Sequence, residues 1–403
     1  MVGRILNLAP TYVFASEGSY STYFVLLGIV SLSIVPFFSL VQKRQVDHFQ
    51  LQRLIIQLLY SRCLQVMSME ALEAASNALD CVLEAKKGES IAIFCDDEKM
   101  DIGQAFTNGA LKLGLKTRLV PLQTEKSTFR QNVPSNLTQI ISNQPPDIYI
   151  NLLRGIREEV VFRIQLIKME TEGHRSRLGH CPGVTMDMLT EGALALTADE
   201  HKKMQGFANE LMKTLSRVEK IMITNPTGTD VSLAVGGRLF FTDTLVDRKT
   251  NKWMNLPTGE VIVAPIEDGM EGQLVCDMAV GGIGPIKDLV KFTVKSGVVS
   301  EVVSKDKNVL SRIKDSLQTD ERSSTVGEFA FGINPKARFI QEFLEAEKLL
   351  GTIHIAFGNN SDFPGGKNPS KNHLDLLVSK PTVRVLNKDG SAAAVLVDGK
   401  FQH

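Results

Sequence analysis

The spacing of apolar residues changes near residue 217, and this change constrains the fold more than any other feature of the sequence. Before it, three short apolar runs predict strands, at 90–95, 116–122 and 147–152. Segments with helical spacing flank these runs, at 71–85, 100–113, 157–170 and 198–216. Short apolar strands that alternate with helices are typical of a parallel sheet with helices on both faces. We therefore expect an open α/β domain over 67–219.

After residue 217 the apolar runs lie close together, with glycine and asparagine turns between them. They predict strands at 220–224, 231–235, 260–265, 273–280, 289–294, 298–302, 352–357 and 374–378. The clearest helical pattern in this half covers 339–350. Closely spaced strands joined by turns indicate a mainly antiparallel, β-rich domain over 220–403. The boundary is expected between 217 and 225, and the chain as a whole is predicted to be of the α+β class.

The first 66 residues form a separate extension. Residues 23–41 are an apolar run of 19 positions without a charge, close to the ~20 residues that span a bilayer. A Lys-Arg pair follows the run and would place its C-terminal side in the cytoplasm. One interpretation is a membrane anchor at 23–41. The other, which we favour, is that 1–66 arises from a start upstream of Met67 or Met69 and that the protein is cytoplasmic.

The charge balance and the cysteines exclude several classes of protein. Lys plus Arg and Asp plus Glu each total 45, so the formal net charge is zero. A chain without a basic excess lacks the charge that supplies affinity for nucleic acid, so we expect no nucleic-acid partner. The chain has 5 cysteines, which are scattered and form no CxxC pair. This argues against a disulfide scaffold and against a cysteine zinc site.

The residues that suggest chemistry lie in three segments of the second half, NLPTGE at 255–260, GEFAFG at 327–332 and the stretch 354–375. Within the last segment, the motif HLD contains His373 and Asp375. On a strand, residues two apart point to the same face, so the imidazole and the carboxylate would lie side by side. A nitrogen and a carboxylate ligand so placed suit a divalent cation such as zinc, cobalt or manganese.

Three other residues are candidates for the same site. His354 alternates with apolar residues and would project beside the small side chains of Thr352 and Ala356, which leave room next to the ring. Glu260 and Glu328 each follow a glycine at the start of an apolar run, so each carboxylate is expected at a strand end beside a turn. Any one of these residues alone is more often a capped or solvated strand end than a ligand.

Taken in order, the motifs NLPTGE, GEFAFG, HIAFG and HLD resemble the thermophilic metalloaminopeptidases of the aminopeptidase T and aminopeptidase S type. The resemblance covers about residue 69 to the C-terminus. It implies an α/β domain joined to a β-rich domain, removal of N-terminal residues from peptide substrates, two divalent metal ions and a homodimer. The metal ligands that it implies are Glu260, Glu328, His354, His373 and Asp375. Glu328 would be the bridging carboxylate, and Glu347 or Glu260 would handle a proton, although Glu347 stands two residues out of register with the family glutamate.

The sequence departs from this family at one position that concerns catalysis. The family has a tyrosine seven residues after the histidine of HIAFG, and this chain has Ser361 there. We therefore name Ser361 as a catalytic candidate that would stabilise the reacting carbonyl oxygen. Asn359 and Lys367 are alternatives for the same role.

Two other functions stay open. A related branch of the fold, the 2,5-dihydroxypyridine dioxygenases, opens a ring with one Fe(II), which His354, His373 and Asp375 would hold here. A non-catalytic binding protein that kept the fold is the third interpretation. Because Glu260 and Glu328 are both present, and a bridging carboxylate is what holds two cations together, we favour the two-metal aminopeptidase.

Overall fold

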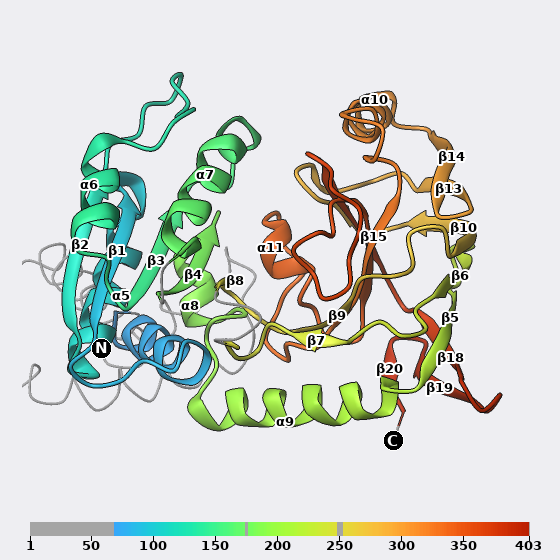
Figure 1. Ribbon diagram of the computed structural model, residues 1–403, viewed down its shortest axis with the longest axis horizontal. Coiled ribbons are helices and arrows are strands. Elements are labelled where there is room, and N and C mark those ends of the chain that lie inside the picture. Colours follow the sequence, from blue (N-terminus) through green and yellow to red (C-terminus); the bar gives the residue numbers. More distant parts are fainter. Residues whose placement is uncertain (1–67, 174–175, 248–252, 403) are drawn as a thin grey trace, which may run out of the picture. The chain divides into compact units, whose positions relative to one another are not determined.

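The computed structural model of the protein describes residues 68–173, 176–247 and 253–402 (Figure 1). The apolar segment 23–41 and the predicted start at Met67 lie outside these ranges. Residues Ser68–His403 form one compact unit. Within the ranges that the structure describes, no helix has the length and apolar character needed to cross a membrane.

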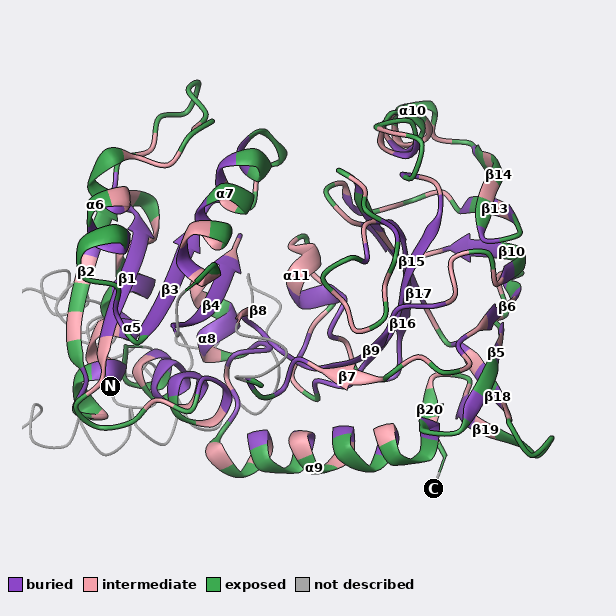
Figure 2. Cartoon of the chain, in the orientation of Figure 1, coloured by how far each residue is buried: buried purple, intermediate pink, exposed green. Residues whose placement is uncertain are grey.

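Five parallel strands form the first sheet, in the order β2-β1-β3-β4-β8. Their bounds are β1 (Ser90–Asp96), β2 (Lys116–Leu122), β3 (Ile148–Leu153), β4 (Arg177–Pro182) and β8 (Trp253–Asn255). Residues 68–77 are helical and lead into η1 (Ala78–Val82). The other helices described in this region are η2 (Asp97–Lys99), α5 (Met100–Lys112), α6 (Ser135–Asn143), η3 (Arg157–Glu159), α7 (Val160–Thr171) and α8 (Met186–Thr190). Ile91 and Ile93 of β1 pack into one hydrophobic cluster, and Ala92 and Phe94 pack into another. Since the residues of β1, β3 and β4 are almost all buried, on both faces of the sheet (Figure 2), the predicted parallel α/β region is confirmed.

The last strand of this sheet comes from the second half of the chain. Residues of β8 pair in parallel with β4, with Trp253 opposite Leu178. This strand is only three residues long and lies beyond the expected boundary at 217–225, so the chain returns to the first sheet after it has begun the second region. The division into 67–219 and 220–403 stays a prediction.

Two antiparallel sheets make up the rest of the structure, as expected for a β-rich region. The eight-stranded sheet has the order β14-β13-β10-β6-β5-β18-β19-β20, and the seven-stranded sheet has the order β12-β11-β17-β16-β15-β9-β7. The eight strands are β5 (Val218–Thr224), β6 (Asp230–Ala234), β10 (Met270–Cys276), β13 (Val290–Lys295), β14 (Val298–Ser304), β18 (Thr382–Asn387), β19 (Ala392–Val397) and β20 (Lys400–Phe401). The seven are β7 (Phe241–Thr242), β9 (Glu260–Val263), β11 (Ala279–Val280), β12 (Gly284–Pro285), β15 (Val326–Gly332), β16 (Ile353–Gly358) and β17 (His373–Val378).

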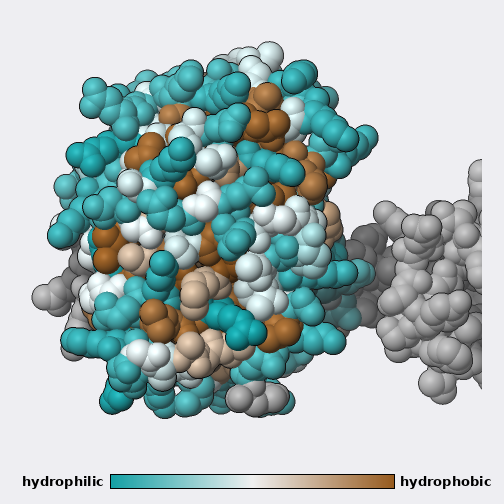
Figure 3. All heavy atoms as spheres, turned by 90° about the vertical axis from the view of Figure 1, so that its right-hand side faces the viewer, coloured by the Kyte–Doolittle hydropathy of each residue, from teal (hydrophilic) through white to brown (hydrophobic). Residues whose placement is uncertain are grey.

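One hydrophobic core joins the two antiparallel sheets. Residues such as Ile221 and Phe292 from the eight-stranded sheet share this core with Phe329 and Ile355 from the seven-stranded sheet. Helix α9 (Ala198–Leu215) adds its buried face, and its first turn is fixed by a capping box between Thr197 and Glu200. The face of the molecule on the side of the eight-stranded sheet shows hydrophobic residues in small groups among hydrophilic ones (Figure 3).

The helix predicted at 339–350 is much shorter in the structure, where α11 covers only Phe343–Ala346. The backbone carbonyl of Lys348 accepts a hydrogen bond from the amide of Asn334, so tertiary pairing ends the helix at this point. Helix α10 (Lys307–Leu317), which was not predicted, begins at Asp306, whose carboxylate accepts the amides of Asn308 and Val309.

Candidate metal centre

Strand alternation places all five predicted ligands on one face of the seven-stranded sheet. On β15, β16 and β17, the residues on either side of the ligands point into the hydrophobic core; they include Phe329, Ile353, Ile355, Leu374 and Leu376. Glu328 and Asp375 each lie opposite Ala356, and Ala330 lies opposite His354. These alanines keep the polar face open beside the ligands, as the small neighbours of His354 predicted.

The two glutamates occupy different places on their strands. Glu260 begins β9 directly after Gly259, as expected, and its amide donates a hydrogen bond of 2.8 Å to the carboxylate of Asp243. A side chain at position 259 would meet Asn334, since a Cβ there would lie 2.5 Å from the Asn334 Cβ. Glu328 is the third residue of β15, so the prediction that it stands at a strand end is wrong, because the strand already begins at Val326.

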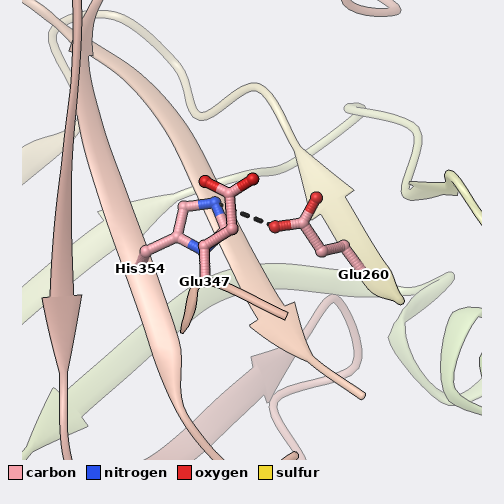
Figure 4. A group of neighbouring side chains, drawn as sticks. All are labelled: Glu260, Glu347 and His354. Carbon is pink, nitrogen blue, oxygen red and sulfur yellow. Dashed lines mark ion pairs between the residues drawn. The ribbon is translucent and has the colours of Figure 1, made fainter. Parts of the chain in front are cut away.

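The side chains gather in two groups. Group one consists of Glu260, Glu347 and His354, and group two consists of Glu328, His373 and Asp375. Within each group, one ligand atom from each residue lies within 4.8 Å of the others. In group one, the three side chains point toward one another, and His354 Nε2 lies 3.3 Å from Glu260 Oε1 (Figure 4).

Glu328 of group two also contacts group one. Its Oε1 atom is 3.2 Å from His354 Nε2, and its Oε2 atom is 2.9 Å from His373 Nε2. The other contact of group two joins His373 Nε2 to Asp375 Oδ1 at 3.2 Å. One carboxylate thus faces a histidine of each group with a different oxygen.

The backbone orients the ring of His373. Its Nδ1 atom lies 2.9 Å from the carbonyl oxygen of Asn359, and since a carbonyl only accepts, Nδ1 is the protonated nitrogen. Nε2, which faces the two carboxylates of group two, then becomes the ligand atom of the neutral ring. This arrangement is typical of histidines that bind metal ions.

The structure adds two residues that the sequence analysis missed, Lys348 and Asp243. Both are buried. The Lys348 ammonium is paired with Glu260 Oε2, and it lies 3.0 Å from Glu347 Oε1 and 3.5 Å from Asp243 Oδ2. The one available signal was the position of Lys348 directly after Glu347 in a segment that otherwise leads into an apolar strand.

The carboxylates favour positive charge at both histidines. Burial lowers the pKa of His354, but Glu260 and Glu328 outweigh burial and raise it to about 10. Burial also lowers the pKa of His373, but Asp375 and Glu328 outweigh burial and raise this pKa well above its usual value. Burial raises the pKa of Glu328, but the two histidines reverse this effect and hold it far below its usual value. The centre is therefore a region where a cation is stabilised.

The donor set fits divalent metal ions. It combines two imidazole nitrogens with four carboxylates, which are ligands that zinc, cobalt and manganese accept. Glu260 Oε1 is buried and has no hydrogen-bond partner among the described residues; it faces His354 Nε2 at 3.3 Å, so it is an available ligand atom. Although Glu347 is two residues out of register with the family glutamate, it lies just after α11 and belongs to group one.

Ser361 belongs to neither group. It is exposed, and its hydroxyl donates a hydrogen bond of 2.6 Å to the Asn359 side-chain oxygen. Because the Asn359 carbonyl contacts His373, this loop lies next to group two. Lys367, the other alternative, is also exposed, and its amide bonds to Glu267. The catalytic role of Ser361 stays a prediction.

Comparison with known proteins agrees with the resemblance of the motifs. The sequence pattern of the thermophilic metalloprotease (M29) family matches residues 197–401. The 2,5-dihydroxypyridine dioxygenase of Pseudomonas putida KT2440 is a structural neighbour, with a TM-score of 0.63 and 15% identity over 83% of this chain and 97% of that chain. The wild-type AmpT of Thermus thermophilus is another, with a TM-score of 0.62 and 18% identity over 83% of this chain and 99% of that chain.

At these identities the two structures establish the fold alone. No curated protein sequence matches this chain. The family pattern, however, spans half of the chain and includes every residue of both groups. The predicted resemblance is thus confirmed, and the chain belongs to the thermophilic metalloprotease (M29) family.

Proposed function

We propose that this protein is a two-metal aminopeptidase that releases N-terminal amino acids from peptides. The observation that carries the proposal is the position of Glu328, which presents one carboxylate oxygen to each of two ligand groups. A carboxylate shared in this way is what a pair of neighbouring cations requires.

Six residues would hold the ions. Glu260, Glu347 and His354 would hold one, Glu328, His373 and Asp375 would hold the other, and Glu328 would also reach the first. When bound, two divalent ions supply a water of lowered pKa and polarise the scissile carbonyl. The support from the fold is that strand pairing fixes five of the six side chains on adjacent strands, so the geometry is rigid before substrate arrives.

Proton transfer needs a carboxylate that can hold a proton near neutral pH. Burial raises the pKa of Glu347 in the metal-free protein, although Lys348 opposes the effect. Because an ion bound to a carboxylate lowers its pKa, we assign the proton-handling role to Glu347 in a centre where Glu260 and His354 hold the ion, and to Glu260 where Glu347 is the ligand. Ser361 and Asn359, in the loop beside His373, would donate a hydrogen bond to the carbonyl oxygen that develops negative charge.

The test is release of N-terminal amino acids from short peptides by metal-depleted protein to which zinc, cobalt or manganese is added. We expect release with at least one of these ions and none from the same peptides with a blocked amino terminus. A folded protein that releases nothing with any of them would contradict the proposal. Oxygen uptake with a dihydroxypyridine and Fe(II) would instead support the ring-cleaving alternative.

The family resemblance implies a homodimer, and the favoured interpretation of residues 1–66 implies a cytoplasmic location. We propose a cytoplasmic homodimer whose substrates are peptides. Light scattering that gives the mass of a single chain would contradict the dimer.

A further inference from the structure

Lys348 distinguishes group one from group two. This side chain is 2% exposed, and its ammonium contacts two ligand carboxylates of group one, those of Glu260 and Glu347. Each of these carboxylates gives one oxygen to Lys348. Group one is thus partly neutralised by a cation that belongs to the protein.

In group two, no lysine or arginine among the described residues forms an ion pair with Glu328 or Asp375. The ion-pair contacts of these two carboxylates in the centre are with His354 and His373. Their oxygens face the place where an ion would bind, and no ammonium among the described residues competes with that ion. The two groups therefore differ in the fixed positive charge beside them.

This inference rests on the proposed two-metal site. We propose that Lys348 is a positioning residue and an internal counter-cation that holds Glu260 and Glu347 in place and makes group one the weaker metal site. Metal ions then load in order, group two first and group one second.

The physical reason is repulsion at short range in a buried place. A divalent ion between Glu260, Glu347 and His354 lies near the ammonium, and burial leaves their repulsion poorly screened. Asp243 offsets a part of that repulsion, because its carboxylate lies 3.5 Å from the same ammonium. Without any cation, however, the three buried carboxylates would repel one another, so Lys348 stabilises the metal-free protein.

The test is a calorimetric titration of the metal-depleted full-length chain with Mn²⁺, for wild type, Lys348→Met and Asp243→Asn. In wild type we expect one tight and one weak binding event. Lys348→Met should tighten the weak event by roughly tenfold, because the competing charge is gone. Without metal, the midpoint of thermal unfolding of Lys348→Met should lie below that of wild type. Saturation with Mn²⁺ should raise this midpoint by more in Lys348→Met than in wild type. A weak event that is unchanged or weaker in Lys348→Met would overturn the inference.

Asp243→Asn is the matched variant with the opposite sign. The asparagine oxygen can still accept the amides of Gly259 and Glu260, but the negative charge beside Lys348 is lost. We expect the weak event to weaken further, and an unchanged event would overturn the inference even if Lys348→Met does not fold.

Asp375→Asn assigns the events to the groups. It should remove the tight event and leave the weak one, and survival of the tight event would show that the order is wrong. All these readouts are binding and stability, so they stand apart from peptide cleavage. Ordered loading in a protein without peptidase activity would support the role of Lys348 and contradict the proposed function. Peptidase activity with a single binding event would support peptide cleavage and contradict the role of Lys348.

Discussion

Two buried histidines, one in the parallel sheet and one in the seven-stranded sheet, respond to burial in opposite ways. For His180 on β4, burial, together with the positive charge of Arg163, lowers the pKa to about 3. His354 on β16 is equally buried, yet the carboxylates around it raise its pKa to about 10. The comparison shows that the carboxylates next to a buried histidine, and not its burial, stabilise positive charge on the seven-stranded sheet.

The sheets themselves show the same contrast. The strands β1, β3 and β4 of the parallel sheet are covered on both faces, and β1 has apolar residues on each. The seven-stranded sheet has a hydrophobic face and a charged face, and successive residues of one strand serve different purposes. Each of the following predictions tests a part of this contrast.

The largest effect is expected from removal of a ligand on the charged face. His373→Ala or Asp375→Ala should abolish activity and lower the metal content, since each removes a ligand from a preorganised group. The fold should remain, because both side chains are partly exposed at the edge of the site. Activity assays, metal analysis and circular dichroism check this. Activity at the wild-type level in either variant would mean that the HLD motif is structural.

The neighbouring residue on the same strand provides the opposite test. Leu376 is fully buried on the hydrophobic face of β17, so Leu376→Ala should cost roughly 2–5 kcal/mol of the free energy of unfolding. Metal binding by the folded protein should persist. Urea unfolding and metal analysis measure the two effects. Loss of metal without loss of stability would show that the two faces are not separate in function.

A pH-dependent effect is expected from His180 in the parallel sheet. Its pKa is about 3 in the folded chain and near 6.5 in the unfolded chain, so below about pH 6.5 the unfolded state binds the proton more readily. The stability that the neutral ring contributes is present above pH 6.5 and is lost as the pH falls toward 3. Between pH 7 and pH 4.5, His180→Leu should remove roughly 2–3 kcal/mol of the acid destabilisation. Urea unfolding at both pH values tests this, and an identical pH dependence in wild type and variant would refute it.

The smallest effect is expected from truncation. The sheet order of the parallel region contains no strand from before Ser90 among the described residues, so a chain that starts at Met67 or Met69 should be soluble, folded and as active as the full chain. Size-exclusion chromatography and peptidase assays measure this. Aggregation of the shortened chain would show that 1–66 packs on the enzyme, and sedimentation of the full chain with membranes would indicate an anchor at 23–41.

The site could be predicted where the signal was local. His354, His373 and Asp375 alternate with apolar residues along single strands, and this period of two determines the face on which they lie. The same reasoning placed most predicted strands to within a few residues, but it missed β4, β18 and β19. It also gave one strand at 273–280, where the structure has β10 and β11 in different sheets.

The sequence pattern failed where distant contacts decide the structure. The helical pattern at 339–350 gave no reason to expect that Asn334 would pair with Lys348 and end α11 after Ala346. For the same reason Lys348 was missed, because only the fold brings its ammonium to Glu260, which lies 88 residues away in the sequence. The short strand β8 likewise forms only because β4 is available as a partner.

Metal analysis of the purified full-length protein tests the central claim most directly. If Glu328 joins two ligand groups as proposed, the protein should contain about two ions of zinc, cobalt or manganese per chain at saturation. A content of one iron per chain, with no second ion bound when zinc, cobalt or manganese is supplied in excess, would contradict the two-metal centre.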